Sequence, residues 1–385
     1  MQKNKKIIMA CTHHLNSSYK VGSHHIYSFL KKNNYDVLYI SAPLTPFHLL
    51  RSSNPDIKVR WALKAKSNLE LVPFSLVAPD ATFPLNSKLV LNYWLKTNFG
   101  SLKQTLKQLD FIDVDAIYVD NIFYHGLLDL IRPQKILFRV MDFHPGFPGW
   151  EGKVKGIASK IARKADVTFY TATGLLRYIE GLGAKKAEYL PNGIDLSLFN
   201  IMEQDKVTLT IPFSDSKSPK VVYVGSLDKW MDWSLIERMA KVLPNFIFDF
   251  YGPITNVHIP DQVKGLNNLT FKGVIKHSEL PTLFRAYDIG IIPFDTINYK
   301  ALVENINPLK LYEYMAAGLP VVSMHWPEIE NIHSKIHLAE SAEQFIHQLK
   351  SVADNLNNNE EKKSYVPASK EWNFILQKLL NELTD

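Results

Sequence analysis

The chain has 385 residues, a net charge of +6 and 46% hydrophobic residues, values typical of a folded protein with two domains. Its apolar runs are far shorter than the roughly 20 residues that a membrane-spanning helix needs. The start lacks the apolar core of a secretory signal, so we expect a cytoplasmic protein, at most peripheral at the inner face of the cytoplasmic membrane. The single cysteine, Cys11, excludes an internal disulfide.

The positive charge is concentrated in the first half of the chain. Residues 1–200 carry a net charge of +11 and residues 201–385 one of −5. A basic domain suits nucleic acid, an anionic bilayer or an anionic saccharide. Cationic residues cluster around Trp61; they are Arg51, Lys58, Arg60, Lys64 and Lys66. Such a mixture of basic and aromatic residues suits lipid headgroups, although a solvated basic face explains it equally well. The charges are spread and no recognition motif is evident, so nucleic acid is not expected.

Strands and helices alternate along the first half of the chain. Apolar runs of strand length are separated by amphipathic stretches of helical period. We predict strands over 6–12, 36–43, 116–120, 135–142 and 167–172, and helices over 23–35 and 152–165. This alternation is typical of a doubly wound α/β domain, which we place at residues 1–200.

A polar segment interrupts the pattern before a second α/β series begins. We interpret residues 201–218 as a linker and residues 219–366 as a second domain. Its strands are expected over 221–226, 246–252, 269–273, 288–294 and 320–324, and its helices over 234–243, 280–287 and 307–318. Residues 367–385 should form a last helix that packs back toward the first domain. The expected architecture is two Rossmann-like domains facing a cleft.

The most informative segment is NPLKLYEYMAAGLPVV, residues 307–322. Asn307 is expected to cap a helix and Pro308 to occupy its first position. Lys310 and Glu313 then share one face. A helix start attracts phosphate through its free N–H groups, so Lys310 could bind a diphosphate and Glu313 a ribose. The alternative is an ordinary surface ion pair.

These residues resemble the donor-binding helix of GT-B enzymes of glycosyltransferase family 4. Segments similar to that family precede it in the same order: PNGIDLSLF, VVYVGSLDKWMDWSLI and LPTLFRAYDIGIIPF. Within the group, the chain is most similar to GumK-like enzymes of bacterial surface-polysaccharide synthesis. The resemblance implies sugar transfer from a nucleotide sugar, expected to be a UDP-sugar, to a glycan or polyprenyl-linked glycan. It implies a hexosyl- or glycuronosyltransferase of capsule or exopolysaccharide synthesis that needs neither cofactor nor metal.

The resemblance also implies which residues bind the donor. They are Gly225, Ser226, Leu227, Lys229, Pro308, Leu309, Lys310 and Glu313. The sequence departs from the family 4 pattern eight residues before Glu313, where a second glutamate is replaced by Asn305, with Glu304 beside it. A retaining mechanism of the family 4 type therefore becomes the alternative rather than the expectation.

Asp142 is the expected general base. It ends an apolar strand, and ligands of open α/β sheets bind at the carboxyl ends of strands. The matching aspartate of GumK-like enzymes is the base, which implies inverting displacement by an acceptor hydroxyl that Asp142 deprotonates. Capping of the following turn is the ordinary alternative. His144 is a weaker candidate for the same role.

Four histidines lie near the start of the chain, His13, His14, His24 and His25. Neither pair has a carboxylate or cysteine at metal-ligand spacing, so no metal is expected. We expect Gly22 to begin a helix that places His24 or His25 near the acceptor or the donor sugar.

Two rival functions are compatible with the sequence. A nucleotide-sugar epimerase would share the fold, and an inactive GT-B chain could act as a binding subunit. A dehydrogenase is disfavoured because no GxGxxG follows the first strand.

Overall fold

The computed structural model describes residues 4–17, 20–51, 55–66, 70–98, 101–199, 218–255, 257–356 and 362–384. The chain forms two compact units, one of residues 1–191 and 376–385 and one of residues 192–375. The first unit thus ends nine residues before the boundary predicted at residue 200. The residues after Pro191 bond within the second unit, where Ile194 accepts from the N–H of Trp372 and donates to the carbonyl of Lys370. Residues 201–217 of the predicted linker lie outside the described residues.

The first unit is built on a parallel seven-stranded sheet with the order β3-β2-β1-β4-β5-β6-β7. Its strands are β1 (Lys6–Ala10), β2 (Asp36–Ile40), β3 (Glu70–Leu71), β4 (Asp113–Val119), β5 (Arg132–Val140), β6 (Val167–Tyr170) and β7 (Ala187–Tyr189). Its α-helices are α1 (Gly22–Lys32), α2 (Pro55–Lys66), α3 (Lys88–Tyr93), α4 (Leu102–Gln108), α5 (Lys155–Lys164) and α6 (Leu176–Leu182). Its 3-10 helices are η1 (Pro46–Arg51), η2 (Trp94–Thr97), η3 (Ile122–Asp129), η4 (His144–Gly146) and η5 (Thr173–Leu175).

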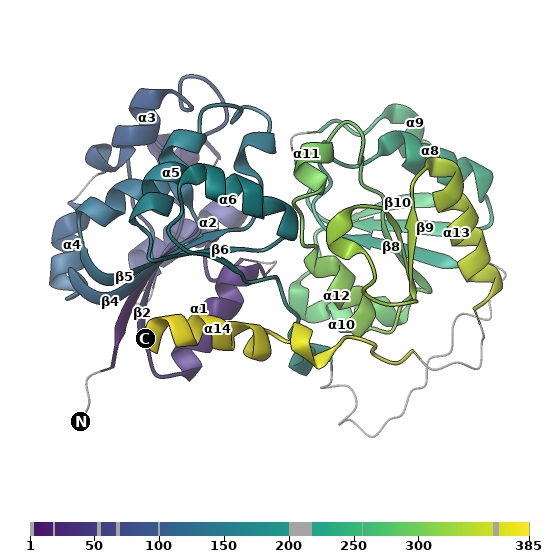
Figure 1. Ribbon diagram of the computed structural model, residues 1–385. Helices are drawn as coiled ribbons and strands as arrows, with labels where there is room; N and C mark the ends of the chain where they lie inside the picture. Colours follow the sequence, from purple (N-terminus) through teal and green to yellow (C-terminus); the bar gives the residue numbers. More distant parts are fainter. Residues whose placement is uncertain are drawn as a thin grey trace. The chain divides into compact units, whose positions relative to one another are not determined.

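Helices cover both faces of this sheet. The apolar sides of α3, α4, η3, α5 and α6 share one buried core with the sheet, and Figure 1 shows α1 and α14 on the opposite side. The last ten residues of the chain belong to this unit, where Lys378 pairs with Glu188 at 2.5 Å and Lys186 with Glu382 at 2.5 Å. The doubly wound architecture predicted for the first half is confirmed.

The second unit contains a parallel six-stranded sheet with the order β10-β9-β8-β11-β12-β13. Its strands are β8 (Lys220–Val224), β9 (Ile247–Tyr251), β10 (Leu269–Gly273), β11 (Ile289–Ile292), β12 (Val321–Met324) and β13 (Ile336–Ala339). Its helices are α8 (Trp233–Val242), α9 (Asp261–Lys264), η6 (His277–Glu279), α10 (Leu280–Arg285), α11 (Lys300–Val303), α12 (Leu309–Ala316), η7 (Pro327–Ile329), α13 (Ala342–Asp354) and η8 (Ala368–Lys370). Helix α14 (Trp372–Thr384) begins here and ends in the first unit.

Two layers of helices cover the second sheet as well. Figure 1 shows α8 and α13 on one side and α10 and α12 on the other. Near-continuous apolar runs fill β8, β11 and β12, and most of their residues are buried, as in strands that are covered on both faces. The predicted α/β series is therefore confirmed in this unit too.

The elements that were predicted differ from the observed ones only at their ends. Other elements were not predicted; they include α2, α3, α4, α6, α13, β3, β7 and β13. Strand β4 begins at Asp113 rather than at residue 116, so Asp113 and Asp115 lie in the strand. Strand β5 ends at Val140, which leaves Asp142 in the following loop. Among the described residues, no helix is both long and apolar enough to cross a bilayer.

Candidate functional site

The strand order of the second sheet reverses between β8 and β11. These two strands pair through Ile289–Val221 and Gly290–Val222, while β9 and β12 lie outside them. The chain leaves the carboxyl ends of β8 and β11 toward opposite sides of the sheet. Open α/β sheets bind ligands in the crevice that this reversal creates. The carboxyl ends of β8 and β11 are therefore the first place to look for a site.

Helix α12 is docked directly on this reversal point. The hydroxyl of Tyr314 accepts from the backbone N–H of Val224 at the end of β8, at 2.9 Å. Its ring lies against Gly290 of β11, where a Cβ atom would come within 2.7 Å of the ring. The ring of Phe284 in α10 packs on Tyr314 at 5.2 Å between centroids. This packing holds the first turn of α12, with Lys310, over the carboxyl ends of both strands.

The half-buried Lys310 is the central cation of this site. Its Nζ lies 5.4 Å from the ring centroid of Tyr223 in β8 and 4.8 Å from that of Phe294 after β11. Burial lowers the pKa of Lys310 to about 8, and the nearby Glu313 acts in the opposite direction. Among the described residues its ammonium has no hydrogen-bond acceptor, so its charge is available to an anion.

Glycine is required at the ends of β8 and β9 beside this lysine. Gly225 has φ +152°, and a Cβ there would come within 2.7 Å of Cε of Lys310. Gly252 has φ +145°, and its Cβ would come within 2.7 Å of the carbonyl carbon of Gly225 and closer still to the oxygen. The N–H of Gly225 donates to Tyr251 of β9 at 2.9 Å. The two glycines let two backbone segments and Lys310 meet at one point.

Replacing Gly252 with alanine should therefore destabilise the protein strongly. We expect a loss of about 2 to 4 kcal/mol and a clear fall in Tm, because the strained φ and the overlap with Gly225 add. Gly156→Ala is the matched control, since Gly156 lies in α5 with nothing within 4 Å of its Cβ position. That change should stabilise by about 0.5 to 1 kcal/mol. Thermal unfolding monitored by circular dichroism measures both, and equal Tm values for the two variants would contradict this account.

The turn after β8 contains three further residues expected to bind the donor. Ser226 Oγ lies 2.8 Å from Thr255 Oγ1, which donates to Asp228 Oδ2 at 2.7 Å. Leu227 is 1% exposed and its side chain belongs to the core, so its predicted contact is limited to the backbone. Lys229 is exposed on the same turn. Thr255 was missed from the sequence because nothing in its surroundings marks it.

The start of α12 differs from the expectation. Pro308, not Asn307, is the capping residue, and Leu309 is the first helical one. The Asn307 side chain is buried instead, where Oδ1 accepts from the N–H of Asn192 at 3.1 Å and Nδ2 donates to Glu328 at 2.8 Å. Within the described residues no side chain caps this helix start. Its first N–H groups are therefore open to an external acceptor.

Glu313 is paired within the protein rather than left facing outward. Its Oε1 lies 3.0 Å from Nε2 of His277 in η6, and both side chains are largely buried. A ligand diol would have to share this carboxylate with the imidazole. His277 was not anticipated, because its 36-residue separation from Glu313 carries no sequence signal.

The first sheet has its own reversal, between β1 and β4. Asp120 follows β4, and Tyr118 donates to its Oδ2 at 3.3 Å. Arg139 of β5 is wholly buried beside it. Gly22 begins α1 against this guanidinium, where a Cβ would come within 3.0 Å of Cζ and closer to Nη1. Arg139 was missed, although a charged residue inside an apolar strand run was a signal for it.

Asp142 lies two residues beyond the end of β5 and is half-buried. Burial raises its pKa to about 6, and the charge of Arg139 acts in the opposite direction. Burial lowers the pKa of His144, in η4, to about 4, so this imidazole is neutral at pH 7. A carboxylate that titrates near neutrality at the carboxyl edge of a sheet is well suited to accept a proton.

Of the two histidines of α1, one is already engaged within the protein. His24 is buried, with Nδ1 accepting from the N–H of Val21 at 3.1 Å and Nε2 lying 2.9 Å from the carbonyl oxygen of His14. Burial also lowers its pKa to about 4. Both ring nitrogens are thus used to hold the helix start, which removes His24 as a sugar ligand. His25 is half-buried one position further. In the part of the chain that is described, no cluster of three His, Cys, Asp or Glu side chains could hold a metal.

The basic cluster around Trp61 is partly turned inward. Arg60 donates to the carbonyls of Ala42 and Pro43 at 2.5 and 2.6 Å, and Trp61 packs on Phe74 at 5.3 Å. Lys58 and Lys64 are exposed. The side chains of Arg51 and Lys66 lie outside the described residues.

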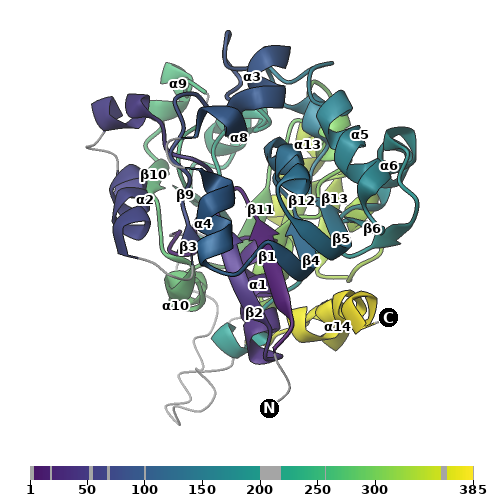
Figure 2. The same ribbon diagram turned by 90° about the vertical axis from the view of Figure 1, so that its left-hand side faces the viewer.

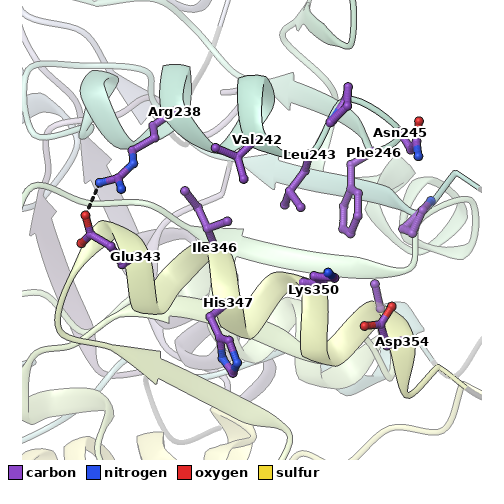
Figure 3. A pocket seen from close by; sticks show the side chains of 13 residues that line it. Arg238, Val242, Leu243, Asn245, Phe246, Glu343, Ile346, His347, Lys350 and Asp354 are labelled. Atoms are coloured by element: carbon purple, nitrogen blue, oxygen red, sulfur yellow. Dashed lines mark hydrogen bonds and ion pairs between the residues drawn. The ribbon is translucent and has the colours of Figure 1, made fainter.

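Another pocket of the second unit lies away from Lys310. It has a volume of about 630 Å³ and is lined by α8 and α13, with Val242, Leu243 and Ile346 facing it (Figure 3). Arg238 and Glu343 form an ion pair at one end. Because its residues Pro219 and Phe246 precede β8 and β9, this pocket is at the amino edge of the sheet and is separate from the candidate site.

The fold and the two carboxyl-edge sites define a class of protein, since two Rossmann-like units of this topology form the GT-B fold. Over nearly their whole lengths, solved structures share it. Sucrose-phosphate synthase from Thermosynechococcus elongatus has a TM-score of 0.68 at 15% identity, covering 99% of both chains. HepE of Anabaena, in complex with UDP and glucose, has a TM-score of 0.65 at 14% identity, covering 99% of this chain and 100% of that one.

The chain is also similar in sequence to known glycosyltransferases. Residues 218–355 match the model of glycosyl transferases group 1. The chain is also 26% identical over 181 residues to the putative teichuronic acid biosynthesis glycosyltransferase TuaH of Bacillus subtilis, a match spanning 45% of this chain and 44% of that protein. The chain therefore has the GT-B fold, and its residues 218–355 are similar to the glycosyl transferases group 1.

Proposed function

We propose that this protein is a glycosyltransferase that moves a sugar from a UDP-sugar to a saccharide acceptor in the synthesis of a bacterial surface polysaccharide. Lys310 carries the proposal, because its half-buried ammonium lies at the strand-order reversal without an acceptor in the described residues. The group 1 match covers this region. The UDP bound to HepE supports the choice of base, and the name of TuaH supports the polysaccharide.

The proposed reaction divides its tasks between the two units. In the second, Lys310 and the open start of α12 stabilise the departing diphosphate. In the first, Asp142 accepts the proton of an acceptor hydroxyl. That oxygen forms a bond to the anomeric carbon while the bond from carbon to diphosphate oxygen breaks, and the configuration is inverted. No step requires a metal, because helix and lysine offset the charge of the leaving group.

Retention of configuration is the second candidate, favoured by the group 1 match. The residues in place of the missing glutamate give it little support. Asn305 donates to the carbonyl of Ala301 at 2.7 Å, and Glu304 pairs with Lys300 at 3.5 Å. The anomeric configuration of the product, read from its proton coupling constants, decides between the two mechanisms.

We extend the proposal to a lipid-linked acceptor handled at the cytoplasmic face of the membrane. The support is the +11 charge of residues 1–200, which suits an anionic surface. Co-sedimentation with phosphatidylglycerol vesicles at low and high salt tests this extension.

A thermal-shift screen of nucleotides tests the donor assignment. UDP should raise Tm with concentration, because a ligand that binds only the folded state stabilises it. Uridine, which lacks the diphosphate, should not. If GDP or ADP stabilises instead, the base is wrong but the diphosphate site stands; if no nucleoside diphosphate acts, the donor site is refuted.

Product analysis separates the rival functions. A transferase releases UDP from a UDP-sugar only with a saccharide acceptor and forms a new glycosidic bond. An epimerase converts the UDP-sugar without an acceptor. Binding of UDP with neither reaction would identify a binding subunit.

A further inference from the structure

A second pocket lies in the first unit, away from Asp142. It has a volume of about 940 Å³ and is lined by parts of α3, η2, α4, η3 and α5. These segments share one side of the seven-stranded sheet, and Figure 2 views the first unit from the direction in which α3 and α4 lie in front. None of Asp120, Arg139 and Asp142 lines it. The pocket is therefore separate from the carboxyl-edge site, and its size is that of a typical small-molecule site.

The charges around this pocket are strongly unbalanced. Its cations come from the three elements η2, α4 and α5. They are Lys96, Lys103, Lys160, Arg163 and Lys164. Asp129 is the one carboxylate in its described lining, and it is engaged by Lys164 at 2.7 Å. A concave surface lined by one sign of charge concentrates the opposite ion.

Two polar side chains of the lining have buried atoms that lack partners. The imidazole of His125, a residue 8% exposed, interacts with the backbone of Ile122, and its buried Nδ1 makes no hydrogen bond of normal geometry among the described residues. The same holds for Nδ2 of Asn98. Native proteins retain few such groups, so these two polar side chains favour a polar occupant of the pocket over an apolar one.

The remaining lining residues are suited to a sugar. Tyr93 is 50% exposed, with Nζ of Lys96 at 4.9 Å from its ring centroid. Asn92 accepts from Lys160 at 2.5 Å and joins α3 to α5. Amides bind hydroxyl groups and an exposed ring packs on the apolar face of a pyranose, while the cations require a carboxylate or a phosphate.

We propose that this pocket is a secondary subsite for an anionic saccharide, a glycan with carboxylate or phosphate groups. The biological role of this subsite rests on the proposed function. In a glycosyltransferase, the subsite would bind a part of a growing anionic glycan that is remote from the reacting hydroxyl. A flat bilayer would leave Asn98 and His125 unsatisfied inside the concavity, which favours the saccharide.

Calorimetric titration with tetragalacturonate tests the proposal. Maltotetraose, a neutral glycan of the same length, serves as the ligand control. Lys103→Gln/Lys160→Gln removes one cation from each of α4 and α5 and should weaken tetragalacturonate binding at least tenfold. Lys31→Gln/Lys58→Gln removes equal charge from exposed positions on α1 and α2 and should change it less than twofold. Equal losses in both variants, or no binding to the unsubstituted protein, would overturn the proposal.

Two further measurements identify the ligand chemistry. Tyr93→Ala should weaken tetragalacturonate but not inorganic phosphate, and the side-chain ¹⁵N signals of His125 should shift with the saccharide. If phosphate alone moves these signals and the saccharide does not, the pocket binds a bare anion and the glycan assignment fails. If only phosphatidylglycerol vesicles depend on Lys103 and Lys160, it is a membrane contact and the proposal is equally refuted. The affinity for UDP should be unchanged in every pocket variant. If the unsubstituted protein does not bind UDP, the proposed function is refuted, but the saccharide subsite is not.

Discussion

Replacing Lys310 with methionine should raise the Kd for UDP about 10- to 100-fold. A hydrogen bond from a charged donor contributes about 1.5 to 3 kcal/mol, and each 1.4 kcal/mol corresponds to a factor of ten. Methionine keeps an unbranched apolar side chain beside the rings of Tyr223 and Phe294, near which the ammonium lies, and removes the charge. Isothermal titration calorimetry with UDP measures the change.

The pH dependence of UDP binding provides an independent check on Lys310. Its pKa in the free protein is about 8, so its charge is present below that pH and lost above it. UDP affinity should therefore decline above pH 8 in the natural protein, and this decline should be absent in the variant. Lys241→Met, at an exposed position of α8, is the matched control and should bind UDP normally.

Stability should change in the opposite sense. Folding lowers the pKa of Lys310 from its ordinary value, so the protonated form costs stability below pH 8. Lys310→Met should raise Tm at pH 7, and the gain should shrink toward pH 10. A variant that is more stable but no longer binds UDP would identify Lys310 as a functional residue. Unchanged UDP binding would instead remove it from the donor site.

Asp142→Asn should lower kcat by about 10² to 10⁴, the usual contribution of a general base. Asparagine keeps the shape of the side chain but cannot accept a proton at neutral pH. Since the pKa of Asp142 is about 6, kcat/KM of the natural protein should fall below that pH, and this acid limb should vanish in the variant. Turnover is measured as UDP release in the presence of a saccharide acceptor.

The same substitution should stabilise the fold, with a definite dependence on pH. Folding raises the pKa of Asp142, so its stabilising effect is greatest at low pH and is lost as the pH rises through about 6. Asp142→Asn should therefore raise Tm more at pH 8 than at pH 4. Asp113→Asn, at an exposed position at the start of β4, should change neither turnover nor this difference.

Two results would count against Asp142 as the base. Unchanged kcat in Asp142→Asn would transfer the role to another group, and His144→Gln would then be the next variant, because His144 is neutral and able to accept a proton. A product of retained configuration would remove the need for a base in direct displacement.

Local patterns in the sequence were sufficient for the architecture and for the place of the donor helix. Apolar runs of strand length and helical periods depend on neighbouring residues, so ten of the thirteen described strands and α12 could be predicted from them. The strands β3, β7 and β13, at the edges of the sheets, were not predicted. Gly225 after β8 and Lys310 in α12 could likewise be selected from the short sequence segments that contain them. Asp142 could be selected as well, because a carboxylate after an apolar strand marks the ligand-binding edge of a sheet.

The pairing of side chains could be decided only by the tertiary structure. His277 meets Glu313, and Arg139 lies against Gly22, across separations that no local pattern spans. The same cause explains the two errors at helix starts. Asn307 and His24 have side chains that suit a helix cap or a ligand. In the folded chain, however, Asn307 bonds to the backbone of Asn192 and to the carboxylate of Glu328, and His24 bonds to the backbone of His14. Sequence by itself determined most of the elements and the chemistry they carry, whereas packing decided which of those groups are already paired and which, like Lys310, have no hydrogen-bond acceptor among the described residues.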